Sequence, residues 1–198
     1  MTAEANTVDG RAAGVLERLA GRPIVFVGMM GAGKTSIGRR VAAALGLPFA
    51  DSDHEIEHAS RMTVADLFEK YGETEFRALE QRVIARLIGE GARVLATGGG
   101  AFMNAETRLA IRQQALSVWL KADLDTLMGR VMKKQHRPLL KSDDPRAVME
   151  RLMAVRYPVY AEADITVLTR DDKRELIADE VMAAVEDHLR KEAGRRHG

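Results

Sequence analysis

The sequence predicts an α/β fold in three layers, with a five-stranded parallel sheet covered by helices on both faces. Two observations carry this prediction. Short apolar runs alternate with helical patterns along the chain, and a glycine-rich loop pattern lies between the first run and the first helix. The length of 198 residues suits one compact domain. In such a doubly wound sheet, ligands bind at the carboxyl ends of the strands.

The first strand is expected at Ile24–Val27, an apolar run that ends at Gly28. The helix after the loop has apolar residues four apart and ends at Gly46 and Pro48. Four more strands are expected near 49–50, at 93–96, at 116–120 and at 164–167. Further helical patterns lie at 53–59, 63–70, 74–89, 105–115, 123–132, 145–155 and 172–191.

The domain is expected to span residues 22–192, between a flexible N-terminal extension at 1–21 and a disordered tail at 193–198. The stretch 133–144 is polar, basic and interrupted by proline, which is typical of a mobile loop. We therefore predict a lid at about 132–144 that closes over phosphates.

Composition narrows the function classes. The formal net charge of +1 gives no broad basic field for nucleic acid, so no nucleic-acid partner is expected. The absence of cysteine excludes disulfides, thiolate nucleophiles and cysteine metal sites. No apolar run approaches the length of a bilayer span, and the first 22 residues lack a signal-peptide core. We expect a cytoplasmic protein without a membrane partner, and a monomer, since no apolar seam is evident.

The segment Gly28–Thr35 matches the phosphate-loop (P-loop) pattern G-x-x-x-x-G-K-[ST] in full. Glycines let backbone N–H groups turn inward around a phosphate, and the N-terminus of the next helix adds partial positive charge. Lys34 is placed to bridge β- and γ-phosphate oxygens, and the Thr35 hydroxyl to bind Mg²⁺. A plain glycine turn is the alternative, but the flanking strand and helix favour a nucleoside triphosphate site.

Two acidic residues, Asp51 and Asp53, follow the second strand, where they reach the same edge of the sheet. One carboxylate can join the Mg²⁺ shell, and the other can accept a hydrogen bond from an acceptor hydroxyl. A helix N-cap is the alternative role. Farther on, Arg77 and Glu80 lie one helical turn apart, so the guanidinium either grips a substrate carboxylate or forms an exposed ion pair.

Three further features complete the candidate acceptor side. The triplet Gly98–Gly100 follows the third strand and offers bare backbone to a small ligand, or is merely a flexible turn. Arg137 in the expected lid can neutralise charge on the transferred phosphoryl group, with a solvated charge as the alternative. Arg156, expected just after a helix, can clamp an anionic acceptor.

In this order and spacing, the motifs resemble those of the shikimate kinase family over residues 22–190. The resemblance rests on the P-loop with Ser36, Asp51-Ser52-Asp53, Phe76-Arg77 with Glu80, Gly98-Gly99-Gly100-Ala101, Arg137-Pro138-Leu139-Leu140, and Arg156 with Tyr160. It implies a P-loop NTPase-like fold of the nucleoside monophosphate kinase type. It also implies ATP-dependent phosphorylation of the 3-hydroxyl of shikimate, a step towards chorismate and the aromatic amino acids.

The resemblance also implies roles for individual residues. Lys34, Asp53 and Arg137 would be the catalytic residues. Mg²⁺ would be bound by Thr35 directly and by Asp51 through water. The nucleotide would be bound by Gly31, Ala32, Gly33, Lys34, Thr35, Ser36, Arg130, Arg137 and Lys173. Shikimate would be bound by Asp53, Arg77, Gly98, Gly99, Gly100 and Arg156, with the two arginines on its carboxylate and Asp53 on its hydroxyls.

Three other functions are suggested by single motifs of the chain. His54 and His58 form an H-E-x-x-H string like that of zinc peptidases, but the helix is short and no spacing marks a third ligand. A kinase resembling gluconate kinase shares the P-loop and an acidic pair, but not the arginine helix, the glycine triplet and Arg156. A regulatory nucleotide switch needs guanine-reading signatures such as Asn-Lys-x-Asp, which the sequence lacks.

Overall fold

The computed structural model describes residues 3–133 and 143–196. In this part of the chain the predicted five-stranded sheet is confirmed, with every neighbouring pair of strands parallel and with the order β2-β3-β1-β4-β5. The first strand therefore lies at the centre, where Ile24 is in register with Val94 on one side and Leu116 on the other. The strands are β1 Ile24–Val27, β2 Phe49–Asp51, β3 Val94–Ala96, β4 Leu116–Lys121 and β5 Ile165–Leu168.

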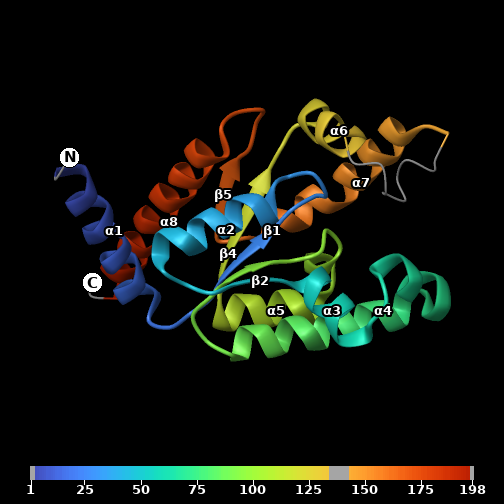
Figure 1. Ribbon diagram of the computed structural model, residues 1–198, viewed down its shortest axis with the longest axis horizontal. Coiled ribbons are helices and arrows are strands. Elements are labelled where there is room, and N and C mark those ends of the chain that lie inside the picture. The colour runs from blue at the N-terminus through green and yellow to red at the C-terminus, as the bar shows by residue number, and fades with distance from the viewer. Residues whose placement is uncertain (1–2, 134–142, 197–198) are drawn as a thin grey trace.

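Helices cover the sheet on both faces, which completes the three predicted layers. Figure 1 shows α1, α2 and α8 together on one side of the strands, and α4 and α5 on the other. The helices are α1 Ala3–Leu19, α2 Lys34–Leu45, α3 Ser52–Ser60, α4 Val64–Gly89, α5 Ala105–Gln114, α6 Leu124–Met132, α7 Pro145–Tyr160 and α8 Arg174–Arg196, with a short 3₁₀ turn η1 at Ala101–Met103. Among these described helices, none is long and apolar enough to cross a bilayer.

The core lies on both faces of the sheet. All four residues of β1 are fully buried, as expected for the central strand of a parallel sheet, whose two faces are both covered. Val41 of α2, Ile84 of α4 and Val185 of α8 are also inaccessible to solvent. Burying a side chain of this kind contributes about 1.5–3 kcal/mol, so the two helix layers hold β1 and the loop after it in a fixed position.

Helix α4 is broken at Gly72, which agrees with the separate helices predicted at 63–70 and 74–89. Gly72 has φ 79° and ψ 172°, a conformation that favours glycine. The helix begins with a capping box, in which Thr63 and Asp66 each accept a backbone hydrogen bond from the other. The helix is therefore kinked at Gly72.

The N-terminal segment differs from the expected flexible extension at 1–21. Helix α1 packs on α8, with Val15 and Leu19 fully buried. An ion pair joins Arg11 to Glu186 at 2.9 Å. The sequence conceals this helix because its stability comes from tertiary packing rather than from local propensity. The tail expected to be disordered at 193–198 likewise continues α8 as far as Arg196.

Helix α7 is longer than the predicted 145–155, and this corrects the expected position of Arg156, which lies inside the helix. Pro158 lies within α7 too, although proline normally ends a helix because it lacks an N–H donor. The side chain of Tyr160, at the end of the helix, is inaccessible to solvent, and its burial stabilises the turn that contains the proline. The expected lid at 132–144 falls between α6 and α7, and its residues 134–142, including Arg137, lie outside the described residues.

Candidate active site

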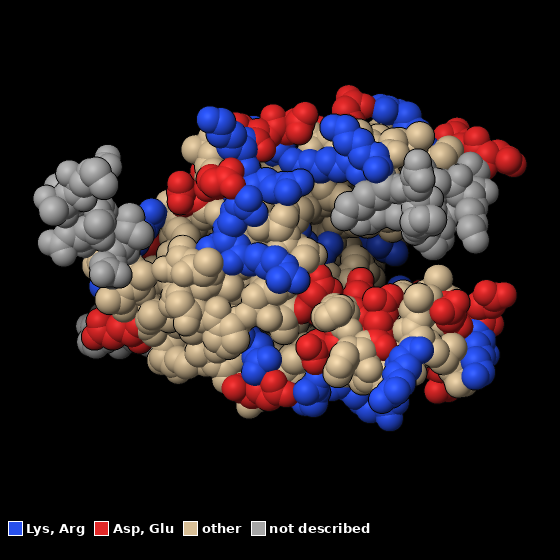
Figure 2. All heavy atoms as spheres, viewed as in Figure 1, with Lys and Arg blue, Asp and Glu red and all other residues tan. Residues whose placement is uncertain are grey.

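The candidate site lies at the carboxyl ends of β1, β2 and β3, where the P-loop, Asp51 and the glycine triplet meet. Figure 2 shows the molecule hollowed beside this edge, between the part that carries α6 and α7 and the part that carries α3 and α4. Acidic side chains gather where α3 and α4 border the hollow, while basic side chains run in a band over α2 towards α6.

The P-loop has the backbone that its glycines predict. Gly28, Gly31 and Gly33 have φ of 134°, 83° and 100°. A Cβ on Gly28 would lie 2.7 Å from the carbonyl oxygen of Leu120, so only glycine lets the loop leave β1 so close to β4. Gly33 precedes α2 without a side-chain cap, which leaves the helix N-terminus available to an anion.

Lys34 lies under this loop and is only 9% exposed. Its Nζ donates to the carbonyl oxygens of Gly28 and Met29 at 2.8 and 2.9 Å. These contacts hold the ammonium group against the inside of the loop. Its positive charge thus lies where the loop would enclose phosphate.

Asp51 makes two hydrogen bonds, one with each carboxylate oxygen. Its Oδ2 accepts from the Thr35 hydroxyl at 2.7 Å, and its Oδ1 accepts from the backbone N–H of Asp53 at 3.1 Å. The second bond is the N-cap of α3, so the alternative role weighed from the sequence is also present. A hydroxyl and a carboxylate side by side are hard oxygen ligands that fit Mg²⁺, which uses one or two protein groups together with phosphate oxygens and water.

Asp53 lies deeper in the site, among other carboxylates. Burial, together with the charges of Asp51 and Glu80, raises the pKa of Asp53 to about 6 from 3.8, although Lys34 acts in the opposite direction. Oδ1 of Asp53 and Oε1 of Glu80 both approach Gly98, where a Cβ would lie 2.6 and 2.5 Å from these atoms. Glycine is therefore the residue that lets the two carboxylates close on the loop after β3.

Glu80 is buried and ion-paired. It is only 2% exposed, and its Oε2 accepts from Nη1 of Arg77 at 2.7 Å, whereas its Oε1 has no hydrogen-bond partner among the described residues. Burial raises the pKa of Glu80, and the adjacent Arg77 acts in the opposite direction. The structure thus brings together the arginine and glutamate that the helical spacing paired, with Glu80 in the interior and Arg77 partly exposed.

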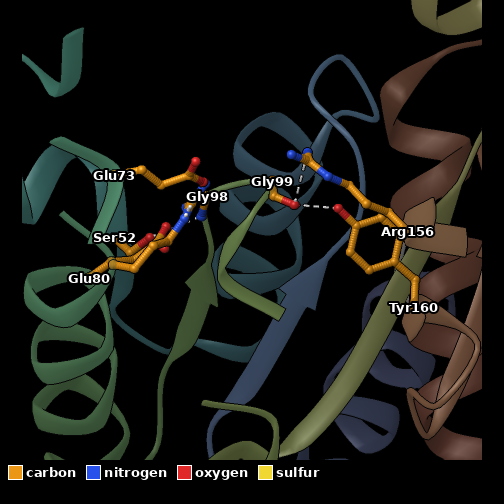
Figure 3. Close-up of polar contacts among 8 residues, drawn as sticks. Ser52, Glu73, Glu80, Gly98, Gly99, Arg156 and Tyr160 are labelled. Carbon is orange, nitrogen blue, oxygen red and sulfur yellow. Dashed lines mark hydrogen bonds and ion pairs between the residues drawn. The ribbon is translucent and has the colours of Figure 1, made fainter. Parts of the chain in front are cut away.

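The glycine triplet is held from two sides, as Figure 3 shows. Ser52 Oγ accepts a hydrogen bond from the Gly98 N–H at 3.0 Å, and Arg156 donates to the Gly99 carbonyl oxygen at 3.4 Å. The hydroxyl of Tyr160, one turn beyond Arg156 on α7, donates to the same carbonyl. At Gly100, a Cβ would collide with the guanidinium of Arg77. The triplet therefore lies between the two arginines.

Sequence reasoning assigned no function to Ser52 or Tyr160. Ser52 is fully buried, and its bond to Gly98 crosses from the end of β2 to the end of β3. Burial raises the pKa of Tyr160 to about 12, so its hydroxyl remains a donor at neutral pH. The spacing of four residues between Arg156 and Tyr160 could have indicated a role for Tyr160, because it places both side chains on one face of a helix.

The residues expected near adenine are only partly brought to the site. Arg130 donates to the carbonyl oxygens of Gly31 and Ala32 at 3.2 and 3.3 Å, and to the Thr169 hydroxyl at 3.1 Å, so it ties the P-loop to the segment after β5. Burial lowers its pKa. Lys173 is exposed in that segment, where its backbone N–H donates to Asp172.

The histidines of the H-E-x-x-H string lie on the surface of α3. His54 and His58 are both exposed, and Glu55 between them pairs with Arg86 at 3.0 Å. Over residues 3–133 and 143–196 there is no group of three or more acidic or histidine side chains that would complete a metal site. The zinc interpretation therefore has no support in the geometry.

Comparison with known proteins identifies the family. The family model described as Shikimate kinase matches residues 30–186. A shikimate kinase of Mesorhizobium japonicum is 65% identical over 186 residues, which make up 94% of this chain and 92% of that protein. The solved structure of shikimate kinase from Acinetobacter baumannii in complex with shikimate is 37% identical, with a TM-score of 0.80 over 85% of this chain and 94% of that one.

A more distant match bears on the rival kinase. A gluconokinase from Sinorhizobium meliloti 1021 is 16% identical, with a TM-score of 0.55 over 89% of this chain and 95% of that one. Identity at this level shows a shared fold alone. Matched over most of its length by the family model and by close relatives, the chain belongs to the shikimate kinase family.

Proposed function

We propose that this chain transfers the γ-phosphoryl group of ATP to the 3-hydroxyl of shikimate, giving shikimate 3-phosphate and ADP on the route to chorismate and the aromatic amino acids. One observation carries the proposal: Asp53, whose pKa is raised to about 6 and on which the charge of Lys34 acts, lies against the first glycine of a triplet that Arg156 and Arg77 border. These residues offer a carboxylate that can accept a hydrogen bond from a hydroxyl, and two arginines that can bind a carboxylate, next to a phosphate site. The structure from Acinetobacter baumannii, solved with shikimate, supports the same ligand here.

The nucleotide side would use the loop and its lysine. The N–H groups of Gly31–Ser36 would surround the β-phosphate, and Lys34 would exchange its two carbonyl partners for phosphate oxygens. Arg130 would border the adenine, because it already lies between the loop and the segment after β5. We extend the adenine site to Lys173, and the phosphoryl site to Arg137, on the family resemblance alone.

Thr35 and Asp51 would hold Mg²⁺, Thr35 by direct ligation and Asp51 through water. Their hydrogen bond of 2.7 Å already brings the two oxygens together at the mouth of the loop. The ion, when bound, would neutralise charge on the β- and γ-phosphates. Oδ1 of Asp51 would continue to cap α3, so the same residue would contact the metal shell and fix the backbone of Asp53.

The acceptor would lie across the glycine triplet. Arg77 and Arg156 would bind its carboxylate, and Asp53 would accept hydrogen bonds from its hydroxyls. Gly98, Gly99 and Gly100 would bring the backbone close to the ring, since a side chain at the first or third of these positions would strike Asp53, Glu80 or Arg77.

Phosphoryl transfer would be direct and in line. The acceptor hydroxyl oxygen would form a bond to the γ-phosphorus while the bond to the bridging β–γ oxygen breaks, and ADP would leave with the electron pair. Asp53 would accept the proton that the hydroxyl loses, a task that suits a carboxylate with a pKa of about 6. Lys34 would stabilise the charge on the transferring group. Positioning and charge neutralisation are sufficient for this chemistry, so no phosphoenzyme is required.

Closure of the lid at about 132–144 would exclude water from the γ-phosphate, and this part of the proposal rests on the sequence. A cytoplasmic location and a monomeric state belong to the same proposal. A small domain with a net charge of +1 and charged residues of both signs over its surface is consistent with both.

A coupled assay of ADP release tests the proposal, with shikimate, with gluconate and without an acceptor. We expect turnover that depends on shikimate and a background rate with gluconate. Equal rates with all three additions would indicate a simple ATPase. Turnover with gluconate alone would assign the acceptor pocket to the rival family.

A further inference from the structure

Arg77 is bound by two carboxylates on two different edges of its guanidinium group. Glu80 accepts a hydrogen bond from Nη1 at 2.7 Å, and its side chain is only 3% exposed. Oε1 of Glu73 accepts from both Nε and Nη2 of Arg77, at 3.3 and 3.2 Å, yet the Glu73 side chain is 69% exposed. One partner is therefore fixed in the interior, while the other reaches the same arginine from solvent.

The edge held by Glu73 is the one that an incoming carboxylate needs. A guanidinium group binds a carboxylate side by side through two adjacent N–H groups. Nη1 is engaged with buried Glu80, so the side-on pair without a buried partner is Nε and Nη2, which both donate to Glu73. An acceptor carboxylate that binds the Nε and Nη2 edge of Arg77 bidentately would lie where the carboxylate of Glu73 now lies.

Arg77 does not need Glu73 to keep its position. The carbon at the centre of its guanidinium group lies 5.5 and 5.3 Å from the ring centroids of Phe68 and Phe76. These two rings pack against each other at 4.4 Å, and the Glu80 bond fixes the other side. The guanidinium group is thus held in place by buried and aromatic contacts that remain if Glu73 moves away.

Glu73 is free to leave because of its place in α4. It follows Gly72, the non-helical residue with φ 79° at the break of the helix. Among the described residues, Arg77 is its only hydrogen-bonded or ion-paired partner. An exposed ion pair of this kind is weak, so a ligand can displace it at little cost.

We propose that Glu73 is an internal competitor for the acceptor: its carboxylate occupies the Nε and Nη2 edge of Arg77 in the unliganded site and is displaced by the acceptor's carboxylate. Glu73 then sets the affinity for anionic acceptors without touching the bound substrate. This inference rests on the proposed function, in which Arg77 receives the carboxylate of shikimate.

Calorimetric binding to the full chain tests the inference, with shikimate and with its uncharged carboxamide as ligands. We expect Glu73→Gln to bind shikimate about two- to fivefold more tightly, the range for loss of an exposed ion pair. The carboxamide and ATP should bind as they do to the parent protein. The matched control is Glu75→Gln, which removes the same charge from an exposed position two residues away and should leave both affinities unchanged.

A double-mutant cycle separates competition from a general charge effect. In an Arg77→Ala background, the Glu73→Gln change should no longer alter shikimate binding, because the shared partner is gone. Weaker shikimate binding by Glu73→Gln would mean that Glu73 positions Arg77 and would overturn the inference. Unchanged binding, or equal tightening of acid and carboxamide, would overturn it as well.

The same measurements distinguish this inference from the proposed function. If the parent protein binds neither shikimate nor its carboxamide, the proposed function and the inference fail together. If the parent protein binds shikimate and Arg77→Ala weakens it, the function stands, and the response of Glu73→Gln alone decides the role of Glu73.

Discussion

Ionised Asp53 is expected to destabilise the fold, and replacing it by asparagine tests this directly. The pKa of Asp53 is about 6 in the folded protein and 3.8 in a free side chain, a difference that corresponds to about 3 kcal/mol. Between these pH values the folded state holds a proton that the unfolded state has lost. Stability therefore falls as pH rises through this window, and the full cost is present above about pH 6.

Urea unfolding of the parent protein and of Asp53→Asn, followed by circular dichroism, measures this cost. At pH 8 we expect the variant to be more stable by up to about 3 kcal/mol, because asparagine carries no charge among Asp51, Glu80 and Glu57. At pH 4 the gap should shrink to less than about 1 kcal/mol. The control Asp179→Asn changes an exposed carboxylate of α8 and should show no such gap. A gap that does not change with pH, or a less stable Asp53→Asn at pH 8, would refute the reasoning.

Four further predictions concern activity. The kcat/KM for shikimate should rise with pH through about 6, since only ionised Asp53 can accept the proton; a flat profile from pH 5 to 8 would exclude this role. Arg77→Ala should raise the KM for shikimate about 10- to 100-fold with the KM for ATP unchanged, as for a lost charged hydrogen bond. Gly98→Ala should lower kcat/KM for shikimate at least about tenfold, because its Cβ would lie 2.5 Å from Glu80, whereas Gly194→Ala in open space should not. Tyr160→Phe should cost about 0.5–1.5 kcal/mol in urea unfolding and lower kcat/KM for shikimate, through the lost bond to the Gly99 carbonyl.

The outcomes that contradict these variant predictions are distinct. Equal losses for shikimate and ATP in Arg77→Ala would place the acceptor elsewhere. Normal kinetics in Gly98→Ala would show that Asp53 and Glu80 need not approach the loop. A Tyr160→Phe variant with normal stability and kinetics would show that the hydroxyl of Tyr160 is not needed to orient Gly99.

The phosphate side of the site was predictable because its signals are local. The P-loop is one continuous segment, and the glycine conformations at 28, 31 and 33 follow from the pattern itself. The Arg77 and Glu80 pair was equally accessible, since a spacing of three on a helix brings side chains together. The strand pattern also predicted the sheet and its parallel direction.

Features that depend on tertiary packing were not predictable in the same way. The bond from Ser52 to Gly98 links residues 46 positions apart and depends on the register of β2 with β3. The burial of Glu80, which turns an apparent surface pair into a partly buried one, depends on how α4 packs against α3, α5 and η1. Helix α1 was missed for the same reason, because α8 stabilises it.

The role of Glu73 lay between these cases. Its spacing of four from Arg77 is a local signal, but the sequence alone could not show which edge of the guanidinium group each glutamate takes. That distinction depends on the break at Gly72 and on the two phenylalanine rings beside Arg77.

The most direct test of the central claim is the identity of the phosphorylated product. Purified protein would be incubated with ATP, Mg²⁺ and an equimolar mixture of shikimate and gluconate, and the products identified by phosphorus–proton correlation NMR. We expect one new phosphate ester, coupled to the proton at carbon 3 of shikimate, in amounts equal to the ADP released. A phosphate ester on gluconate or at another shikimate hydroxyl, or ADP release without any ester, would contradict the assignment of Asp53, Arg77 and Arg156 as the acceptor site.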